Sequence, residues 1–220
     1  MRYVNLFADR KDFYGVHLTK AGVYSFVPRL FFSTQILELN FFLRGGDRIN
    51  KPTKITNGDA YRIRWQLSEQ DRLIFDFSVE TGLRISDILR IKSNKLQQKI
   101  TVRESKTKKY KTVELSDGLF SRLKHLTGNG ERVYAFRSPR TPYKHLHRST
   151  YHLHLKRVCT ALKINFSAHS ARKLYAQNIF EETADIFAVQ KALNHKYITT
   201  TCAYLDIDLV GLLKDFSKGE

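Results

Sequence analysis

The stretch SEQDRLIFDFSVETGLR, residues 68–84, gives a clear secondary-structure pattern. Ser68 and Asp71 have the form of a capping box that begins a helix. The positions that then recur at helical spacing are Leu73, Ile74, Phe77 and Ser78. Gly82 is suited to end the helix, because glycine readily adopts the left-handed conformation. The stretch therefore predicts a helix that ends just before Arg84.

Working outward from this helix, the sequence predicts one small sheet and several more helices. Ile100 and Val102, and then Val113 and Leu115, alternate with polar residues on either side of residues 106–109, a pattern typical of a β-hairpin with a basic tip. Further helices are expected at residues 116–126, 149–162, 171–182, 186–193, 199–205 and 209–216. The predicted fold class is mainly α with a small antiparallel β-sheet (α+β).

Residues 1–52 differ in character from the rest of the chain. They are rich in Tyr, Phe and Leu, and they end in Gly45-Gly46 and Pro52, which are boundary signals. We therefore expect a short accessory segment at 1–52 and one main domain at 53–220, a length that supports a sizeable core.

The balance of charge points to a polyanionic partner. Lys and Arg number 38 against 21 Asp and Glu, a formal net charge of +17. Such a surplus on a folded chain indicates nucleic acid or, less commonly, an anionic membrane. The longest apolar stretch, 31–43, is interrupted by polar residues and is shorter than the roughly 20 residues of a spanning helix. Asp9, Arg10 and Lys11 lie where a signal peptide would be apolar, so we expect a cytoplasmic protein without membrane attachment.

Two basic stretches are the candidate DNA contacts. Residues 90–111 hold nine Lys or Arg and a single acid, Glu104, and residues 137–157 hold six Lys or Arg, four His and no acid. Such stretches can also be ordinary solvated faces. We expect phosphate contacts from Lys92, Lys108, Lys109, Lys111, Arg148, Lys156, Arg157 and Lys173.

A metal site is a weaker alternative for the second basic stretch. His145, His147, His152 and His154 form two His-x-His pairs, but neither acidic nor cysteine ligands lie near them in the sequence. Only two cysteines, Cys159 and Cys202, are present, which argues against a disulfide framework or a Cys-rich zinc site. We expect neither a metal ion nor another cofactor.

Five polar features stand out along the main domain, and each has an ordinary explanation when taken alone. An arginine after a helix end is usually solvated, and a lysine at a hairpin tip is usually just exposed. A His-x-x-Arg pair can be a cap with a salt-bridge partner, and a tyrosine on an apolar helix face is usually packing. The features are Arg84, Lys106, His169 with Arg172, His195, and Tyr204.

The order and spacing of these features resemble the tyrosine recombinase, or phage integrase, family. TGLRISDIL at 81–89 resembles the first box of the family, SKTKKYKTVEL at 105–115 resembles its lysine hairpin, and DIFAVQKALNHKYITTTCAYL at 185–205 resembles its closing His-to-Tyr box. The resemblance extends from about residue 54 to about residue 216. One such box is weakly specific, whereas all of them in order are strongly specific.

The resemblance implies how a phosphodiester would be held. Arg84 and Arg172 would face the non-bridging oxygens, where charge accumulates in the transition state and where a planar, always protonated guanidinium is well suited. His195 would hydrogen-bond the phosphate, and Asp87 would brace the pocket.

The resemblance also implies the groups that react. Tyr204 would be the nucleophile and would form a 3′-phosphotyrosyl intermediate that preserves the bond energy for religation. His169 would help to deprotonate it, and Lys106 would donate a proton to the leaving 5′-oxygen. The cations are side chains, so this chemistry calls for no metal.

The sequence departs from the usual text of the family in two places. Ala171 and Lys173 flank the second arginine, where Leu and His are commonest, and Asn194 replaces the glycine before the last histidine. Residues 1–52 are also too few for the helical core-binding domain that many members carry. The layout resembles the short fimbrial-switch invertases, whose catalytic domain stands nearly alone.

Three functions are consistent with the sequence: a site-specific recombinase, a topoisomerase IB-like or hairpin-forming relative, and an inactive DNA-binding module. For the first, the resemblance implies a partner of double-stranded DNA and a homotetramer on DNA that is monomeric when free. The apolar residues of 209–216 predict a last helix, which can fold back on the core of its own chain. The resemblance implies instead that this helix packs on a neighbouring protomer in the DNA-bound assembly, and in cis or loosely in the free monomer.

Overall fold

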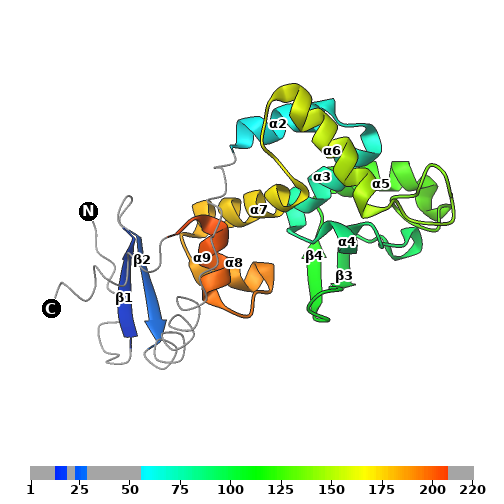
Figure 1. The fold of residues 1–220 in the computed structure, drawn as a ribbon. Coiled ribbons are helices and arrows are strands. Elements are labelled where there is room, and N and C mark those ends of the chain that lie inside the picture. Colours follow the sequence, from blue (N-terminus) through cyan, green and yellow to red (C-terminus); the bar gives the residue numbers. More distant parts are fainter. Residues whose placement is uncertain (1–12, 19–22, 29–55, 208–220) are drawn as a thin grey trace.

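A computed structural model gives the structure of the protein and describes residues 13–18, 23–28 and 56–207 (Figure 1). In the N-terminal segment, β1 (Phe13–Leu18) pairs antiparallel with β2 (Val23–Pro28) in a simple hairpin register. The sequence analysis did not predict this hairpin. The rest of residues 1–52, expected to be an accessory segment, and the helix expected at 209–216 lie outside the described residues.

The main domain is mostly helical with one small sheet, which confirms the predicted fold class. Its elements are α2 (Asn57–Gln66), α3 (Glu69–Thr81), α4 (Ile85–Ile88), η1 (Ser93–Lys95), β3 (Lys99–Arg103), β4 (Tyr110–Glu114), α5 (Asp117–Thr127), η2 (Gly128–Gly130), α6 (Arg148–Leu162), α7 (Ala168–Thr183), α8 (Ile186–Leu193) and α9 (Ile198–Leu205). The sequence analysis missed the helices α2 and α4. None of the described helices is long and apolar enough to cross a membrane.

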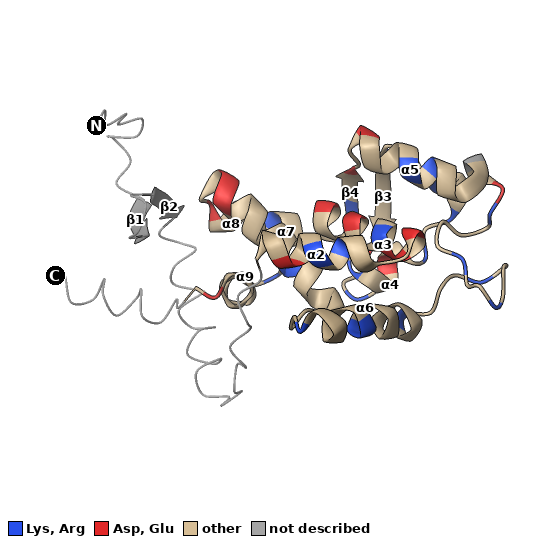
Figure 2. Cartoon of the chain, turned by 90° about the horizontal axis from the view of Figure 1, so that it is seen from above, with Lys and Arg blue, Asp and Glu red and all other residues tan. Residues whose placement is uncertain are grey.

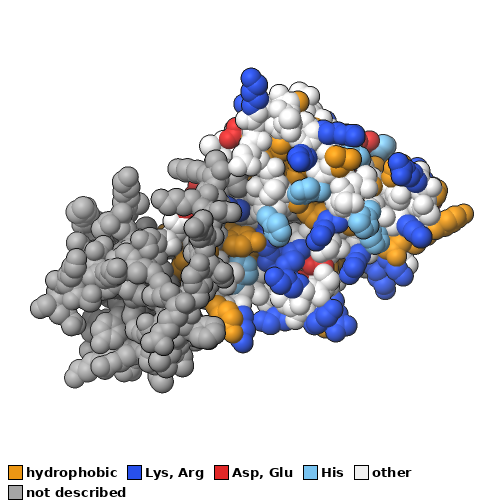
Figure 3. Space-filling model, in the orientation of Figure 1, with side chains coloured by type: hydrophobic (Ala, Val, Ile, Leu, Met, Phe, Trp, Pro, Cys, Tyr) orange, Lys and Arg blue, Asp and Glu red, His pale blue; other side chains and the backbone are white. Residues whose placement is uncertain are grey.

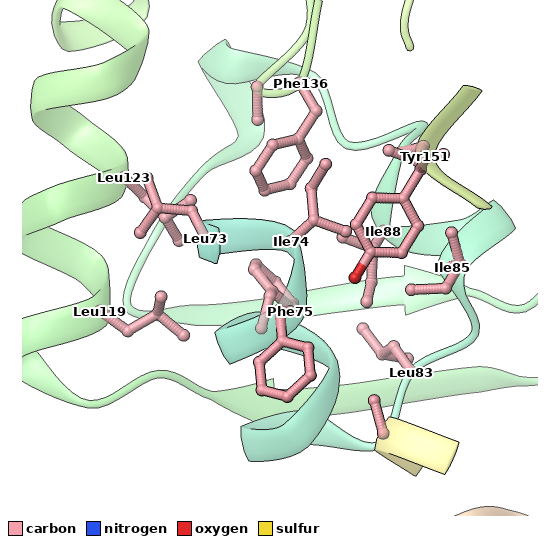
Figure 4. Packing of buried hydrophobic residues seen from close by; sticks show 14 of the residues in the cluster. Leu73, Ile74, Phe75, Leu83, Ile85, Ile88, Leu119, Leu123, Phe136 and Tyr151 are labelled. Atoms are coloured by element: carbon pink, nitrogen blue, oxygen red, sulfur yellow. The ribbon is translucent and has the colours of Figure 1, made fainter. Parts of the chain in front are cut away.

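Helix α3 lies at the centre of the domain and packs against α2, α4, α5, α6 and α7. Its buried side chains, which include Leu73 and Ile74, face the apolar side chains of α5 and α6 (Figure 4). Phe77 also meets Phe136 edge to face, with ring centroids 6.4 Å apart. Burial of this apolar surface drives the packing, and it makes α3 the support for the loop that follows it.

Helix α7 packs against α3 and also against α8 and α9 (Figure 1). It therefore connects α8 and α9 to the rest of the main domain. It begins at Ala168, three residues earlier than predicted, because Ser167 and Ser170 form a reciprocal capping box. His169 therefore lies in the first helical turn. Arg172 follows three residues later on the same face.

Helix α6 also begins slightly earlier than predicted. The Nδ1 atom of His147 accepts a hydrogen bond from the Ser149 N–H and caps the helix at Arg148. This position is usually filled by Ser, Thr, Asp or Asn, which is why the sequence pattern pointed to Ser149 instead.

Gly82 is required for two independent reasons at the end of α3. Its φ is +62°, in the left-handed region that favours glycine. A Cβ atom at this position would also lie 2.1 Å from Cδ1 of the Tyr175 ring on α7. The predicted helix end at Gly82 is confirmed, and the close approach to α7 is its second cause.

We predict that Gly82→Ala lowers the free energy of unfolding by about 2–4 kcal/mol, the sum of the left-handed penalty and the displacement of the Tyr175 ring. Gly118→Ala is the matched control, because no atom lies within 4 Å of a Cβ built there and the helix favours alanine. Denaturant unfolding of both variants measures the difference. Equal stability of the two variants would contradict both the left-handed penalty and the restriction by Tyr175.

Candidate active site

Arg172 is the buried centre of the site. Its side chain is 2% exposed, and its Nη1 and Nη2 atoms donate to the backbone carbonyls of Gly82 (2.5 Å) and Leu193 (2.7 Å). Burial and the nearby Arg84 lower the pKa of Arg172, while Tyr204 and Glu104 raise it. The guanidinium stays charged, since arginine does not deprotonate in proteins. It therefore ties α7 to the ends of both α3 and α8.

Arg84 approaches the same place from the loop after α3. It is the N-cap residue of α4, and its side chain is 19% exposed. Its Nη1 atom donates to Oε1 of Glu104 at 2.6 Å, and Nη1 of Arg172 lies 3.6 Å from that same oxygen. The two guanidiniums thus converge on one carboxylate oxygen.

Lys106 lies in the turn between β3 and β4. The turn is closed by backbone hydrogen bonds between Glu104 and Lys109 and between Lys108 and Glu104, both 2.9 Å. Oδ1 of the buried Asp87 accepts from the Ser105 N–H at 3.0 Å, which holds the turn against α4. Lys106 itself is exposed.

His195 follows α8 and is half-buried. Burial has the largest effect on its pKa, and together with the charges of Arg172 and Arg84 it lowers this pKa to about 4. The ring is therefore neutral at neutral pH. Its Nδ1 atom lies 3.1 Å from the hydroxyl of Thr201. The charge of Lys106 also lowers this pKa, which places the hairpin lysine in the same electrostatic environment.

His169 lies at the rim of the site. Partial burial and the positive charges of Arg172, Arg148, Arg84 and Lys106 lower its pKa. An imidazole that is neutral at physiological pH is able to accept a proton.

Tyr204 completes the arrangement from α9 of the same chain. Its ring meets the His195 ring edge to face, with centroids 5.1 Å apart and an interplanar angle of 69°. A hydrogen bond with Tyr204 is one of the interactions that raise the pKa of Arg172. The phenol therefore lies beside the buried guanidinium. One side of the tyrosine packs on the small apolar cluster of Ala176, Val189 and Leu193.

The structure thus brings together the six side chains that the sequence analysis selected for catalysis, with Asp87 behind the lysine turn. Sequence reasoning missed Glu104, which is fully buried between the two arginines. One signal was present in the sequence: Glu104 is the only acid among nine basic residues.

Lys173, which was predicted to contact DNA, is buried in this structure. Lys173 is 5% exposed, and its Nζ atom lies 2.5 Å from Oδ2 of Asp206, the residue that caps α9. A buried ammonium needs such a partner, and the pair fixes the end of the helix that carries Tyr204.

Lys111 also differs from the prediction. Its Nζ atom donates to the Thr81 carbonyl at 2.6 Å and lies over the Tyr175 ring. Burial and the charge of Arg172 lower its pKa to about 8. The ammonium of the half-buried Lys111 therefore faces the end of α3 in this structure.

The other predicted contacts are exposed, and they are Lys92, Lys108, Lys109, Arg148, Lys156 and Arg157. Figure 3 shows one face on which Lys, Arg and His side chains gather with few acidic ones among them. Helix α6 carries part of this charge (Figure 2). The face therefore carries the kind of positive charge that phosphate binding requires.

Three of the four histidines of 145–154 have separate partners of their own. Nδ1 of His145 lies 2.8 Å from the Leu146 carbonyl, His147 caps α6, and His154 lies 2.9 Å from Asp71. Among the described residues, no group of three or more His, Cys, Asp or Glu side chains is placed to hold a metal ion.

Solved structures share this fold. The catalytic core of lambda integrase superposes with a TM-score of 0.55 at 21% identity, over 66% of this chain and 96% of that one. The XerH site-specific recombinase bound to its difH substrate superposes with a TM-score of 0.60 at 21% identity, over 77% of this chain and 55% of that one.

Comparisons of sequence identify the family to which the chain belongs. Tyrosine recombinase XerA of Thermococcus kodakarensis is 27% identical over 159 residues, 69% of this chain and 56% of that protein, so the chain spans about half of its length. The probable integrase/recombinase YoeC of Bacillus subtilis is 30% identical over 145 residues, 64% of this chain and 80% of that protein. The model of the phage integrase family matches residues 57–209, which hold all six clustered side chains. The chain belongs to the phage integrase family.

Proposed function

We propose that the protein is a site-specific tyrosine recombinase that cleaves and rejoins DNA through a 3′-phosphotyrosyl bond to Tyr204. The observation that carries this proposal is the position of the Tyr204 phenol beside Arg172 and His195, in the same chain. The names of the relatives, which include tyrosine recombinases XerA and XerD, support it.

In the proposed reaction, Arg84 and Arg172 hold the non-bridging oxygens of the scissile phosphate. The Tyr204 oxygen attacks phosphorus and its proton passes to His169, while the bond to the 5′-oxygen breaks. Lys106 gives a proton to that leaving oxygen. Attack by a 5′-hydroxyl in the reverse direction releases the tyrosine and joins the strands.

The charges of the site fit these roles. Two permanent guanidinium cations stabilise the extra negative charge of the transition state, so the proposed chemistry calls for no metal ion or other cofactor. His195, with its pKa near 4, acts as a neutral hydrogen-bonding group toward the phosphate.

The proposed partner is double-stranded DNA, bound through the exposed basic residues around the site. We further propose that the protein is a monomer in solution and assembles into a homotetramer on DNA. The proposed location is the cytoplasm, in association with the nucleoid. Lambda integrase has been solved as a tetramer bound to a Holliday junction, with a TM-score of 0.55 to this chain. Residues 1–52, which precede the family match, are proposed as an accessory element that includes the β1–β2 hairpin.

Tyr204→Phe is predicted to abolish the covalent protein–DNA adduct and to leave the DNA dissociation constant within about 3-fold, since affinity comes from the basic surface. The assay uses nicked duplexes tiled across the DNA that flanks the coding sequence, followed by denaturing electrophoresis. Tyr197→Phe, an exposed tyrosine at the start of the same helix, is the control and should retain the adduct.

An adduct formed by the Tyr204→Phe variant would contradict the assignment of the nucleophile. Strand exchange between two sites then separates a recombinase from a topoisomerase-like enzyme, which joins the cut strand only to itself.

Duplex DNA binding is predicted to weaken steeply with salt, because each phosphate contact releases counterions with a slope of about −0.9 in log K against log[salt]. Lys156→Ala should make that slope shallower by about 1, since Lys156 is exposed on α6. Lys173→Met should leave the slope unchanged, because its ammonium is buried against Asp206. A shallower slope for Lys173→Met would restore Lys173 as a phosphate contact.

A further inference from the structure

Glu104 is a fully buried carboxylate at the centre of a basic site. Its side chain is 0% exposed, and it lies in the turn after β3. An unpaired carboxylate is strongly destabilising in such a place, so its partners must hold it in a defined position.

The two oxygens of Glu104 contact every segment that carries a clustered side chain except α9, which carries Tyr204. Oε1 accepts from Arg84 at 2.6 Å and lies 3.6 Å from Arg172. Oε2 accepts from the hydroxyl of Thr107 at 2.7 Å, next to Lys106, and from the amide of Asn194 at 3.3 Å, next to His195. One carboxylate therefore connects the loop after α3, the lysine turn and the end of α8.

The two arginines depend on this carboxylate to different degrees. Arg172 is also held by the carbonyls of Gly82 and Leu193. Among the described residues, the side chain of Arg84 has Glu104 as its hydrogen-bond acceptor. Loss of the carboxylate would therefore release Arg84 and leave Arg172 in place.

Asn194 adds a contact that a glycine at the same position lacks. It caps α8 with φ +58°, a conformation that asparagine tolerates better than most residues. Its side-chain amide donates to Glu104, whereas the glycine usual at this position in the resembling family has no donor to offer. Asn194, which departs from the usual sequence of the family, thus makes a specific contact with Glu104 in this structure.

We propose that Glu104 is the positioning residue of this site: it holds the Arg84 guanidinium in the orientation that receives the phosphate, and it aligns the Lys106 and His195 segments with it. Glu104 does not itself touch DNA. The proposal rests on the proposed recombinase function only for its catalytic consequence, since the arrangement of Arg84 can be measured without DNA.

The first experiment compares Glu104→Gln with wild type on the duplex that gives the adduct. Glutamine has the same shape, and its oxygen can still face Arg84, but it lacks the charge that fixes the guanidinium. We expect the single-turnover cleavage rate to fall about 10–100-fold, the size of effect that a misplaced reactive geometry produces. The dissociation constant for DNA should stay within about 3-fold or become tighter, because a negative charge near the phosphate is removed.

Two further variants define the effect. Glu114→Gln is the matched control, an exposed glutamate on the paired strand β4, and should cleave at the wild-type rate. Asn194→Gly keeps the left-handed turn and removes one hydrogen bond to Glu104, so it should slow cleavage only a few-fold. A Glu104→Gln variant that cleaves as fast as wild type, or faster, would mean that Glu104 merely reduces the positive charge, and would overturn the proposal.

A double-mutant cycle tests whether Glu104 acts through Arg84. On an Arg84→Ala background, Glu104→Gln should reduce the cleavage rate by much less than it does alone. Equal losses on both backgrounds would show that Glu104 does not act through this arginine.

The last measurement needs no DNA substrate. In ¹⁵N–¹H spectra of the free protein, Arg84 should give separate, slowly exchanging guanidinium signals in wild type and averaged signals in Glu104→Gln, while Arg172 should remain fixed in both. Averaged Arg84 signals in wild type would overturn the proposal whatever the cleavage assay shows. Absence of any adduct with wild type, together with a fixed Arg84, would instead count against the proposed function alone.

Discussion

The buried guanidinium of Arg172 is the interaction on which the arrangement of the site depends. A permanently charged group inside a protein must find acceptors for its N–H groups, because an unpaired buried charge is strongly destabilising. The acceptors here are the carbonyls of Gly82 and Leu193, at the ends of two different helices. The same contacts that satisfy the charge therefore fix the loop that leads to Arg84 and the loop that leads to His195.

The charges of the site are unbalanced in a way that suits an anionic substrate. Arg84, Arg172 and Lys111 all interact with the carboxylate of Glu104, and Lys106 adds a further cation at the edge. Burial, and after it this excess of positive charge, lowers the pKa of both histidines in the site. One electrostatic environment thus prepares a place for a phosphate and keeps the imidazoles neutral, with nitrogens able to accept protons or hydrogen bonds.

Neighbouring basic residues in the sequence have separate structural tasks. Arg172 faces the site, whereas Lys173 next to it is buried against Asp206 and holds the end of the tyrosine-bearing helix. Lys108 and Lys109 are exposed, whereas Lys111 bonds to the Thr81 carbonyl. A count of Lys and Arg therefore indicates the partner of the protein, but it does not identify which cations face that partner.

The sequence by itself determined α3 with its cap and its glycine end, the β3–β4 hairpin and the identity of the clustered side chains, because these depend on local periodicity, on turn residues and on motif order. The sequence analysis did not predict the hairpin β1–β2 or the helices α2 and α4. It also did not predict the partners of Lys173 and Lys111, which only the tertiary structure shows. Glu104 shows the reason: its four partners come from positions 84, 107, 172 and 194, and no local pattern links them. Only the tertiary structure brings such groups together, since burial of a charge is satisfied by whatever polar atoms the folded chain places around it.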